Sequence, residues 1–218
     1  MQRRSPAFIA STSSFPNPAL YGDEELIAIS EAFTPDMVKR AYPKGIFPWF
    51  EQEGFIFWFC THPRMLMQPS EVYVSKSMRK VLRDETFQIR QNTAFEQVMR
   101  ACSEIPRGRE NESWISERFI EVFLALHQEG VAHSAEAWVG NELVGGLYGL
   151  KIGQVFYGES MFARQSNASK AAYIEYCRAL EVEGIKLIDC QVPSEHLNSL
   201  GGRILPKNHF LQLLASLQ

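Results

Sequence analysis

Three consecutive segments in the second half of the chain have the period-two pattern of β-strands. They cover residues 131–139, 142–152 and 155–162. Gly140-Asn141 and Gly153-Gln154 separate them, and two-residue connections that contain a glycine are typical of tight hairpins. Strands joined in this way pair in the order in which they occur. The sequence therefore predicts an antiparallel meander at the centre of the fold.

Helical patterns surround the meander. We expect helices over residues 35–42, 75–84, 93–103, 116–128, 167–183, 193–200 and 206–217, and strands over 45–50, 55–59 and 185–192. Thr34, the Thr93/Glu96 pair and Asn167 are the expected N-terminal caps. This order indicates an α+β fold. Residues 1–62 are expected to form a small N-terminal α/β subdomain, and residues 63–218 a second domain.

Charge and cysteine content exclude several classes of protein. The 218 residues include 22 Lys and Arg against 25 Asp and Glu, a formal net charge of −3. A general nucleic-acid coat protein would be basic overall, although a local basic patch remains compatible with this balance. The four cysteines lie far apart without a C-x-x-C pair, which is typical of a reducing cytosol. We see neither a signal peptide nor an apolar run that could span a bilayer, and we expect a cytoplasmic protein.

Three polar residues near strand ends could carry chemistry. Asp189 and Gln191 alternate on a predicted strand, so their side chains should share one face. They could fix a proton-bearing group, or they could be a buried pair that binds neighbouring backbone. Glu159 is either an anchor for a ligand amine or a solvated charge at a strand end. Cys190 would point to the opposite face, which disfavours a thiol nucleophile.

A basic stripe and two tryptophans could bind nucleic acid. Four basic residues share one face of the predicted helix 75–84, namely Lys76, Arg79, Lys80 and Arg83. They are either phosphate ligands or an ordinary solvated face. Trp49 and Trp114 stand in turn-like contexts, where an indole could stack on a base, although most tryptophans are core residues. The sequence contains no nucleotide-binding loop, serine-hydrolase elbow or zinc-protease motif, and its histidines lack metal-ligand spacing, so we expect no metal.

From Phe15 onward the chain resembles the leucyl/phenylalanyl-tRNA–protein transferases. The stretches that carry the resemblance include AYPKGIFPWF (41–50), HPRM (62–65), VSKSMRKVLR (74–83), LVGGLYGLKIGQVFYGESMFARQSNASKAA (143–172) and LIDCQVPSEHLNSLGG (187–202). The chain departs from the usual family pattern at 27–33, 60–62 and 110–113. The resemblance implies a small N-terminal subdomain joined to a domain like the Gcn5-related N-acetyltransferases, with a mixed, largely antiparallel sheet.

The resemblance also implies an activity. Such enzymes move Leu or Phe, and also Met, from tRNA to the α-amino group of proteins that begin with Lys or Arg, which marks those proteins for N-degron degradation. Acetyltransferases bind coenzyme A at an R-x-x-G-x-G loop, whereas this chain has ARQSNASK, so an aminoacyl-tRNA is the expected donor. Two rival functions stay open: a small-molecule N-acyltransferase and a non-catalytic tRNA-binding protein.

The resemblance assigns roles to individual residues. It implies Asp189 and Gln191 as the catalytic pair and Glu159 as the active-site carboxylate. Trp49 and Trp114 would hold the terminal adenosine, and the basic stripe would bind tRNA. The side-chain pocket would be formed by Phe156, Met161, Tyr176 and Ile188, with Leu147 as a weaker member. No cofactor is implied, and we expect a monomer.

The expected reaction is aminolysis of an ester, which needs no metal. We expect Gln191 to accept a hydrogen bond from the attacking amine. Asp189 would orient or polarise the Gln191 amide and help to take the proton. On this view, replacing Asp189 by Asn and Gln191 by Ala would abolish transfer and leave folding nearly unchanged.

Overall fold

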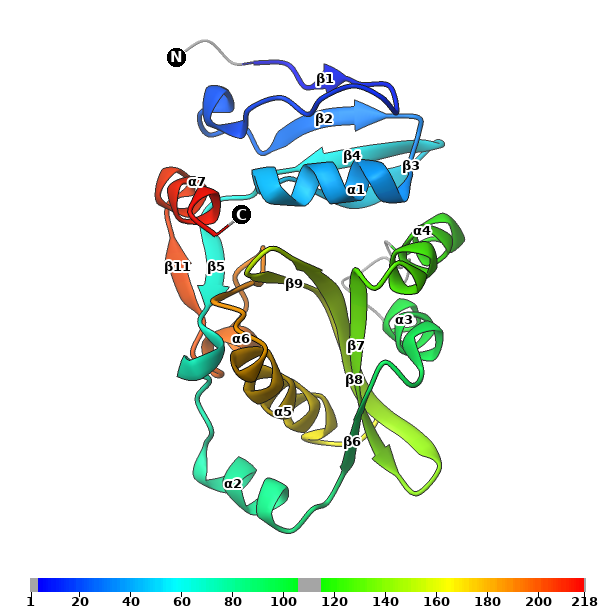
Figure 1. Cartoon of the computed structure of the whole chain (residues 1–218), viewed down its shortest axis with the longest axis vertical. Helices are drawn as coiled ribbons and strands as arrows, with labels where there is room; N and C mark the ends of the chain where they lie inside the picture. The colour runs from blue at the N-terminus through cyan, green and yellow to red at the C-terminus, as the bar shows by residue number, and fades with distance from the viewer. Residues whose placement is uncertain (1–3, 106–114, 218) are drawn as a thin grey trace.

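A computed structural model describes residues 4–105 and 115–217 of the chain. Trp114 and the sequence departure at 110–113 therefore lie outside the described residues. The strands form two sheets, which Figure 1 shows one above the other. The first sheet is built from residues before 60 and the second from residues after 63, and both carry helices. This arrangement confirms the predicted α+β class.

The first sheet has four strands in the order β1-β2-β4-β3. Its strands are β1 (Ala7–Phe8), β2 (Leu26–Ser30), β3 (Phe47–Gln52) and β4 (Phe55–Phe59). Helix α1 (Pro35–Ala41) begins after Thr34, whose hydroxyl accepts a hydrogen bond from the N–H of Met37 at 3.3 Å, as predicted. Two 3-10 segments, η1 (Pro18–Tyr21) and η2 (Tyr42–Lys44), complete this part, and a third, η3 (Pro69–Glu71), follows the first strand of the second sheet.

The second sheet has seven strands in the order β11-β5-β10-β9-β8-β7-β6. Its strands are β5 (Arg64–Met67), β6 (Gln88–Gln91), β7 (Ala132–Val139), β8 (Glu142–Ile152), β9 (Val155–Ala163), β10 (Leu187–Asp189) and β11 (Arg203–Leu205). The strands β7, β8 and β9 pair antiparallel in sequence order, which confirms the predicted meander. The pairing of β10 with β9 is parallel, so the sheet is mixed and largely antiparallel, as expected.

Helices cover both faces of the second sheet. The helices are α2 (Lys76–Arg83), α3 (Phe95–Ser103), α4 (Glu117–Gln128), α5 (Ala168–Val182), α6 (Glu195–Asn198) and α7 (Lys207–Ala215). Figure 1 shows α5 against one face and α3 and α4 against the other. The last helix, α7, returns to the first sheet, where it packs on η1 and η2. The C-terminal helix therefore contacts the N-terminal part of the molecule.

Two predicted helix caps are wrong. Helix α3 has Ala94 at its N-cap, because the Thr93 hydroxyl donates a hydrogen bond to the buried carboxylate of Glu136 at 2.8 Å and Glu96 pairs with Arg100. Asn167 precedes α5 in a left-handed conformation (φ 71°) and makes no side-chain cap. The N-cap of α3 therefore depends on Glu136, a buried residue of another element that the local sequence around Thr93 does not reveal.

Strands β9 and β10 pair over only a short length and then separate. Their register matches Leu187–Asp189 with residues 155–157, and β9 continues alone on that side to Ala163. The predicted strand 185–192 is thus too long, because Gln191 has a left-handed backbone (φ 56°) that ends the extended conformation. On the β8 side, the register shifts around Glu159, which is a β-bulge. The separation opens the sheet beside the bulge.

Candidate active site

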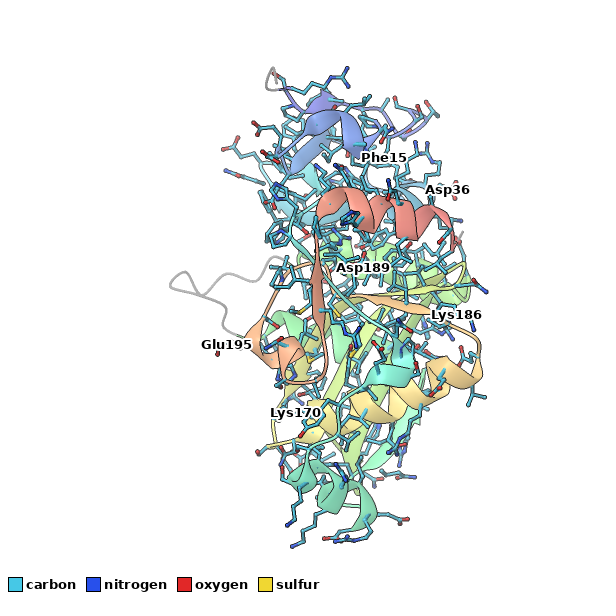
Figure 2. All side chains as sticks on the ribbon, turned by 90° about the vertical axis from the view of Figure 1, so that its left-hand side faces the viewer. Phe15, Asp36, Lys170, Lys186, Asp189 and Glu195 are labelled. Atoms are coloured by element: carbon cyan, nitrogen blue, oxygen red, sulfur yellow. The ribbon has the colours of Figure 1, made fainter. Side chains whose placement is uncertain are left out.

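The Asp189 carboxylate, at the end of β10, is in a buried ion pair with Arg64 of β5. Nε of Arg64 donates to Oδ1 at 2.8 Å and Nη2 donates to Oδ2 at 2.6 Å, and neither side chain is more than 1% exposed. The guanidinium also lies over the rings of Phe47 and Phe210, at 5.0 and 4.6 Å from their centroids. Figure 2 places Asp189 in the middle of the molecule, just below α7. Both charges are therefore held away from water and neutralise each other.

The same carboxylate fixes the backbone of Gln191. Oδ1 of Asp189 accepts a hydrogen bond from the Gln191 N–H at 2.9 Å. The Gln191 carbonyl accepts bonds from the Thr61 hydroxyl and from the Met65 N–H, both at 3.3 Å. The expected shared strand face of Asp189 and Gln191 is wrong, since β10 ends at Asp189. Asp189 contacts the main chain of Gln191, and the side-chain amide turns elsewhere.

The side-chain amide of Gln191 is bound to Glu159. Its Nε2 donates to Oε1 of Glu159 at 2.9 Å, and the hydroxyl of Tyr42 donates to the same oxygen at 2.9 Å. Desolvation by the surrounding protein raises the pKa of the Glu159 carboxyl to about 7, although both hydrogen bonds act to lower it. Glu159 lies at the β-bulge of β9, beyond the residues that pair with β10. Glu159, Gln191 and Tyr42 thus form one hydrogen-bonded cluster.

Sequence reasoning missed Arg64, Tyr42 and Thr61. Tyr42 lies 117 positions from Glu159, and Arg64 lies 125 positions from Asp189. One local signal was present, because Arg64 opens the otherwise apolar run Arg64–Met67. An arginine in a wholly buried strand requires an acidic partner, and this requirement points to a buried carboxylate elsewhere in the chain.

A cavity of about 390 Å³ lies beside this cluster. Its wall includes Glu159 and three of the predicted pocket residues, Leu147, Met161 and Ile188. The other two, Phe156 and Tyr176, do not line it. Both are buried in the same apolar cluster as Leu147 and Ile188, with their rings 5.1 Å apart and nearly perpendicular. The structure thus brings the predicted apolar residues together. Three of them form part of the cavity wall, and the other two are buried behind that wall.

The expected tryptophan pair is only partly visible. Trp49 is half-buried on β3, where its ring packs edge-on against Phe59 with centroids 5.0 Å apart. It is not among the residues that line the cavity. Trp114 lies outside the described residues, so the arrangement of the pair stays a prediction.

The four basic residues of the stripe are exposed on α2. Ser75 caps this helix through a bond from the Met78 N–H to its hydroxyl at 3.2 Å, and Met78 is buried beneath it. Figure 1 shows α2 at the end of the molecule opposite the first sheet. The stripe and the Glu159 cluster therefore lie in different parts of the molecule.

No cluster of three or more metal-ligating side chains occurs within residues 4–105 and 115–217. Within the same residues, no helix combines the length and the apolar character that a membrane crossing requires.

Comparisons with known proteins identify the family. Residues 66–215 match the family described as leucyl/phenylalanyl-tRNA protein transferase, and residues 31–62 match its N-terminal domain. The transferase of Nitrosomonas eutropha is 45% identical over 91% of this chain and 85% of its own length. That of Christiangramia forsetii is 44% identical over 95% and 99%. A solved protein of unknown function from Bacteroides thetaiotaomicron is 13% identical over 62% of this chain and 52% of its own, with a TM-score of 0.45. The chain belongs to the leucyl/phenylalanyl-tRNA protein transferase family and is an aminoacyltransferase.

Proposed function

We propose that this enzyme transfers Leu or Phe, and also Met, from aminoacyl-tRNA to the α-amino group of proteins that begin with Lys or Arg. The observation that carries the proposal is the hydrogen bond of the Gln191 amide to Glu159, which lines an apolar cavity. The products would enter N-degron degradation in the cytoplasm. The enzyme would act as a monomer, without a metal or a cofactor.

The cavity supports the choice of donor amino acid. Leu147, Met161 and Ile188 offer an apolar wall, backed by Phe156 and Tyr176, to an unbranched-at-Cβ side chain such as that of Leu, Phe or Met. An Ile or Val side chain would add a methyl group at the mouth. A hydrophobic pocket discriminates such a difference by about 1–3 kcal/mol, so we expect Ile to be rejected roughly 10- to 200-fold rather than absolutely.

The Gln191 amide supports the choice of reaction. Because its Nε2 is bound to Glu159, its Oε1 is the remaining acceptor, and within the described residues no hydrogen bond reaches that atom. An acceptor α-amine has a pKa of about 7.7–8.0, so a useful fraction is neutral near pH 7. Gln191 would accept a hydrogen bond from this amine and position it for attack on the ester. The Asp189–Arg64 pair would keep the Gln191 backbone in place.

Two further elements would hold the tRNA. The exposed basic stripe on α2 would contact the phosphate backbone, which carries no information about the attached amino acid. Trp49 and Trp114 would hold the terminal adenosine by stacking.

A transfer assay tests the proposal. Leu-, Phe-, Met- and Ile-charged tRNA compete for one peptide that begins with Arg, and a peptide that begins with Asp serves as the matched control. We expect transfer of the first three to the Arg peptide. Equal transfer of Ile and Leu would show that the cavity does not select the donor. Binding of coenzyme A would favour a small-molecule N-acyltransferase, and tRNA binding without transfer would favour a non-catalytic protein.

A further inference from the structure

Ester aminolysis has to move one proton. The attacking amine loses a proton when its nitrogen bonds to the carbonyl carbon, and the departing ribose oxygen gains one when the ester C–O bond breaks. A carboxamide is too weak a base to hold this proton, so Gln191 can position the amine but cannot be the acceptor. A further group beside Gln191 has to perform the transfer.

Asp189 is not suited to the task. Both of its oxygens bind Arg64, one of them also binds the Gln191 N–H, and its side chain is completely buried. Protonation would leave the Arg64 charge without a partner in a dry environment, which is costly. The Cys190 thiol lines the cavity, but burial raises its pKa to about 12, so it is not a base near neutral pH.

Glu159 meets the geometric requirements. Its carboxylate lines the cavity and binds the amide that would hold the amine. Oε1 accepts both hydrogen bonds, from Tyr42 and from Gln191, and within the described residues none reaches Oε2. One carboxylate oxygen thus anchors the cluster and the other is available to a substrate.

We propose that Glu159 is the catalytic base of this transfer, taking the proton of the attacking amine on Oε2 and returning it to the 3′ oxygen of the leaving ribose. The amine would direct one N–H to Oε1 of Gln191 and another to Oε2 of Glu159. The new C–N bond forms, the C–O3′ bond breaks, and the carboxylate is regenerated. This inference rests on the proposed function, because it assumes an amine acceptor and an ester donor at this cavity.

Tyr42 would tune this base as a positioning residue. Its buried hydroxyl donates to Oε1 and favours the ionised carboxylate, as does the hydrogen bond from Gln191. The charges of Asp189 and Arg64 act in opposite directions, Asp189 raising and Arg64 lowering the pKa of Glu159. With desolvation as the largest influence, the pKa is about 7. A base with a pKa near the working pH is largely in its ionised form and still has a useful affinity for a proton.

The pH dependence of kcat/KM for the acceptor peptide, at saturating Leu-tRNA, tests the proposal. Two groups must then lose a proton, the peptide amine and Glu159, so log kcat/KM should rise with a slope near 2 below about pH 6.5. Glu159→Gln retains a similar shape and an oxygen for Tyr42 and Gln191. It should lower the rate by about 10²–10⁴-fold and leave only the slope of 1 that belongs to the amine.

Tyr42→Phe provides the second variant. It removes one hydrogen bond from Glu159, so the Glu159 break in the profile should move to higher pH while the break of the amine stays in place. Any of three results would overturn the role of Glu159 as the base. They are a slope of 1 in the wild type, a pH profile that does not move in Tyr42→Phe, and near-normal rates in Glu159→Gln. Thermal unfolding of each variant establishes that it is folded. If the wild type transfers no Leu at any pH, it is the proposed function that fails.

Discussion

Replacing Asp189 by Asn should destabilise the fold as well as the active site. The change keeps the shape of the side chain but removes its charge, so the Arg64 guanidinium loses its buried counter-ion. The amide nitrogen of the new side chain would also face a donor, because Nη2 of Arg64 lies 2.6 Å from Oδ2. If the amide turns over, its nitrogen faces Nε of Arg64 and the Gln191 N–H instead. Neither orientation satisfies all of the donors.

The size of the effect follows from the burial of the pair. Removing one partner of a buried ion pair costs about 3–5 kcal/mol, because the other charge stays desolvated. The rings of Phe47 and Phe210 lie against the guanidinium and offset part of this cost. For a chain of this length, the loss corresponds to a fall in Tm of about 6–20 °C.

Chemical denaturation of four proteins measures the effect. They are the wild type, Asp189→Asn, Arg64→Met and the double variant, and the double variant should cost at least about 1.5 kcal/mol less than the sum of the single variants. Glu175→Gln is the control, because its partner Arg178 is 54% exposed and such pairs contribute about 0–1 kcal/mol. An Asp189→Asn free energy of unfolding within about 0.5 kcal/mol of the wild type would refute the reasoning.

Two further variants test other parts of the molecule. Changing Lys76, Arg79, Lys80 and Arg83 together to Ala should weaken the binding of Leu- and Phe-tRNA equally. In filter binding, the slope of log affinity against log salt concentration should fall by nearly one unit per lost phosphate contact. An unchanged slope would show that the stripe is an ordinary solvated face. Gly149→Ala should lower the free energy of unfolding, measured by thermal unfolding, by about 1–3 kcal/mol, because its Cβ would lie 2.1 Å from the Tyr157 carbonyl oxygen. Gly158→Ala is the control and should be nearly neutral, because the nearest neighbours of its Cβ would be 3.9 Å away.

Local sequence patterns predicted the helices and strands that are determined mainly by the residues within them. The meander over residues 132–163 follows from periodicity and from turn residues, and helix α2 follows from periodicity alone. The short strands β5, β6 and β11 were not predicted, because each has three or four residues and is defined by its neighbours in the sheet. Pairing over long separations leaves no local periodic signal.

The candidate site shows the same limit. The resemblance named Asp189, Gln191 and Glu159, but the expectation that Asp189 acts on the Gln191 side chain used strand alternation across residues 189–191. That alternation fails because Gln191 has a positive φ. The expectation that folding would tolerate the loss of Asp189 overlooked Arg64. In the antiparallel pairing of β5 with β10, Asp189 lies opposite Leu66, and Arg64 lies two residues from Leu66 along β5. A short strand and a single left-handed residue thus change which atoms meet.

The candidate site depends on distant parts of the chain, although Glu159, Asp189 and Gln191 all follow residue 62. Tyr42, which binds Glu159, belongs to η2 of the first part, and Phe210, which covers the Arg64 guanidinium, belongs to α7. The two elements η2 and α7 also pack against each other. Gly45 makes this possible, because a Cβ there would lie 2.7 Å from the Phe210 ring and the backbone has a φ of 75°. A small residue at the end of η2 therefore permits the contact that keeps the Arg64–Asp189 pair dry, and with it the backbone of Gln191 in place.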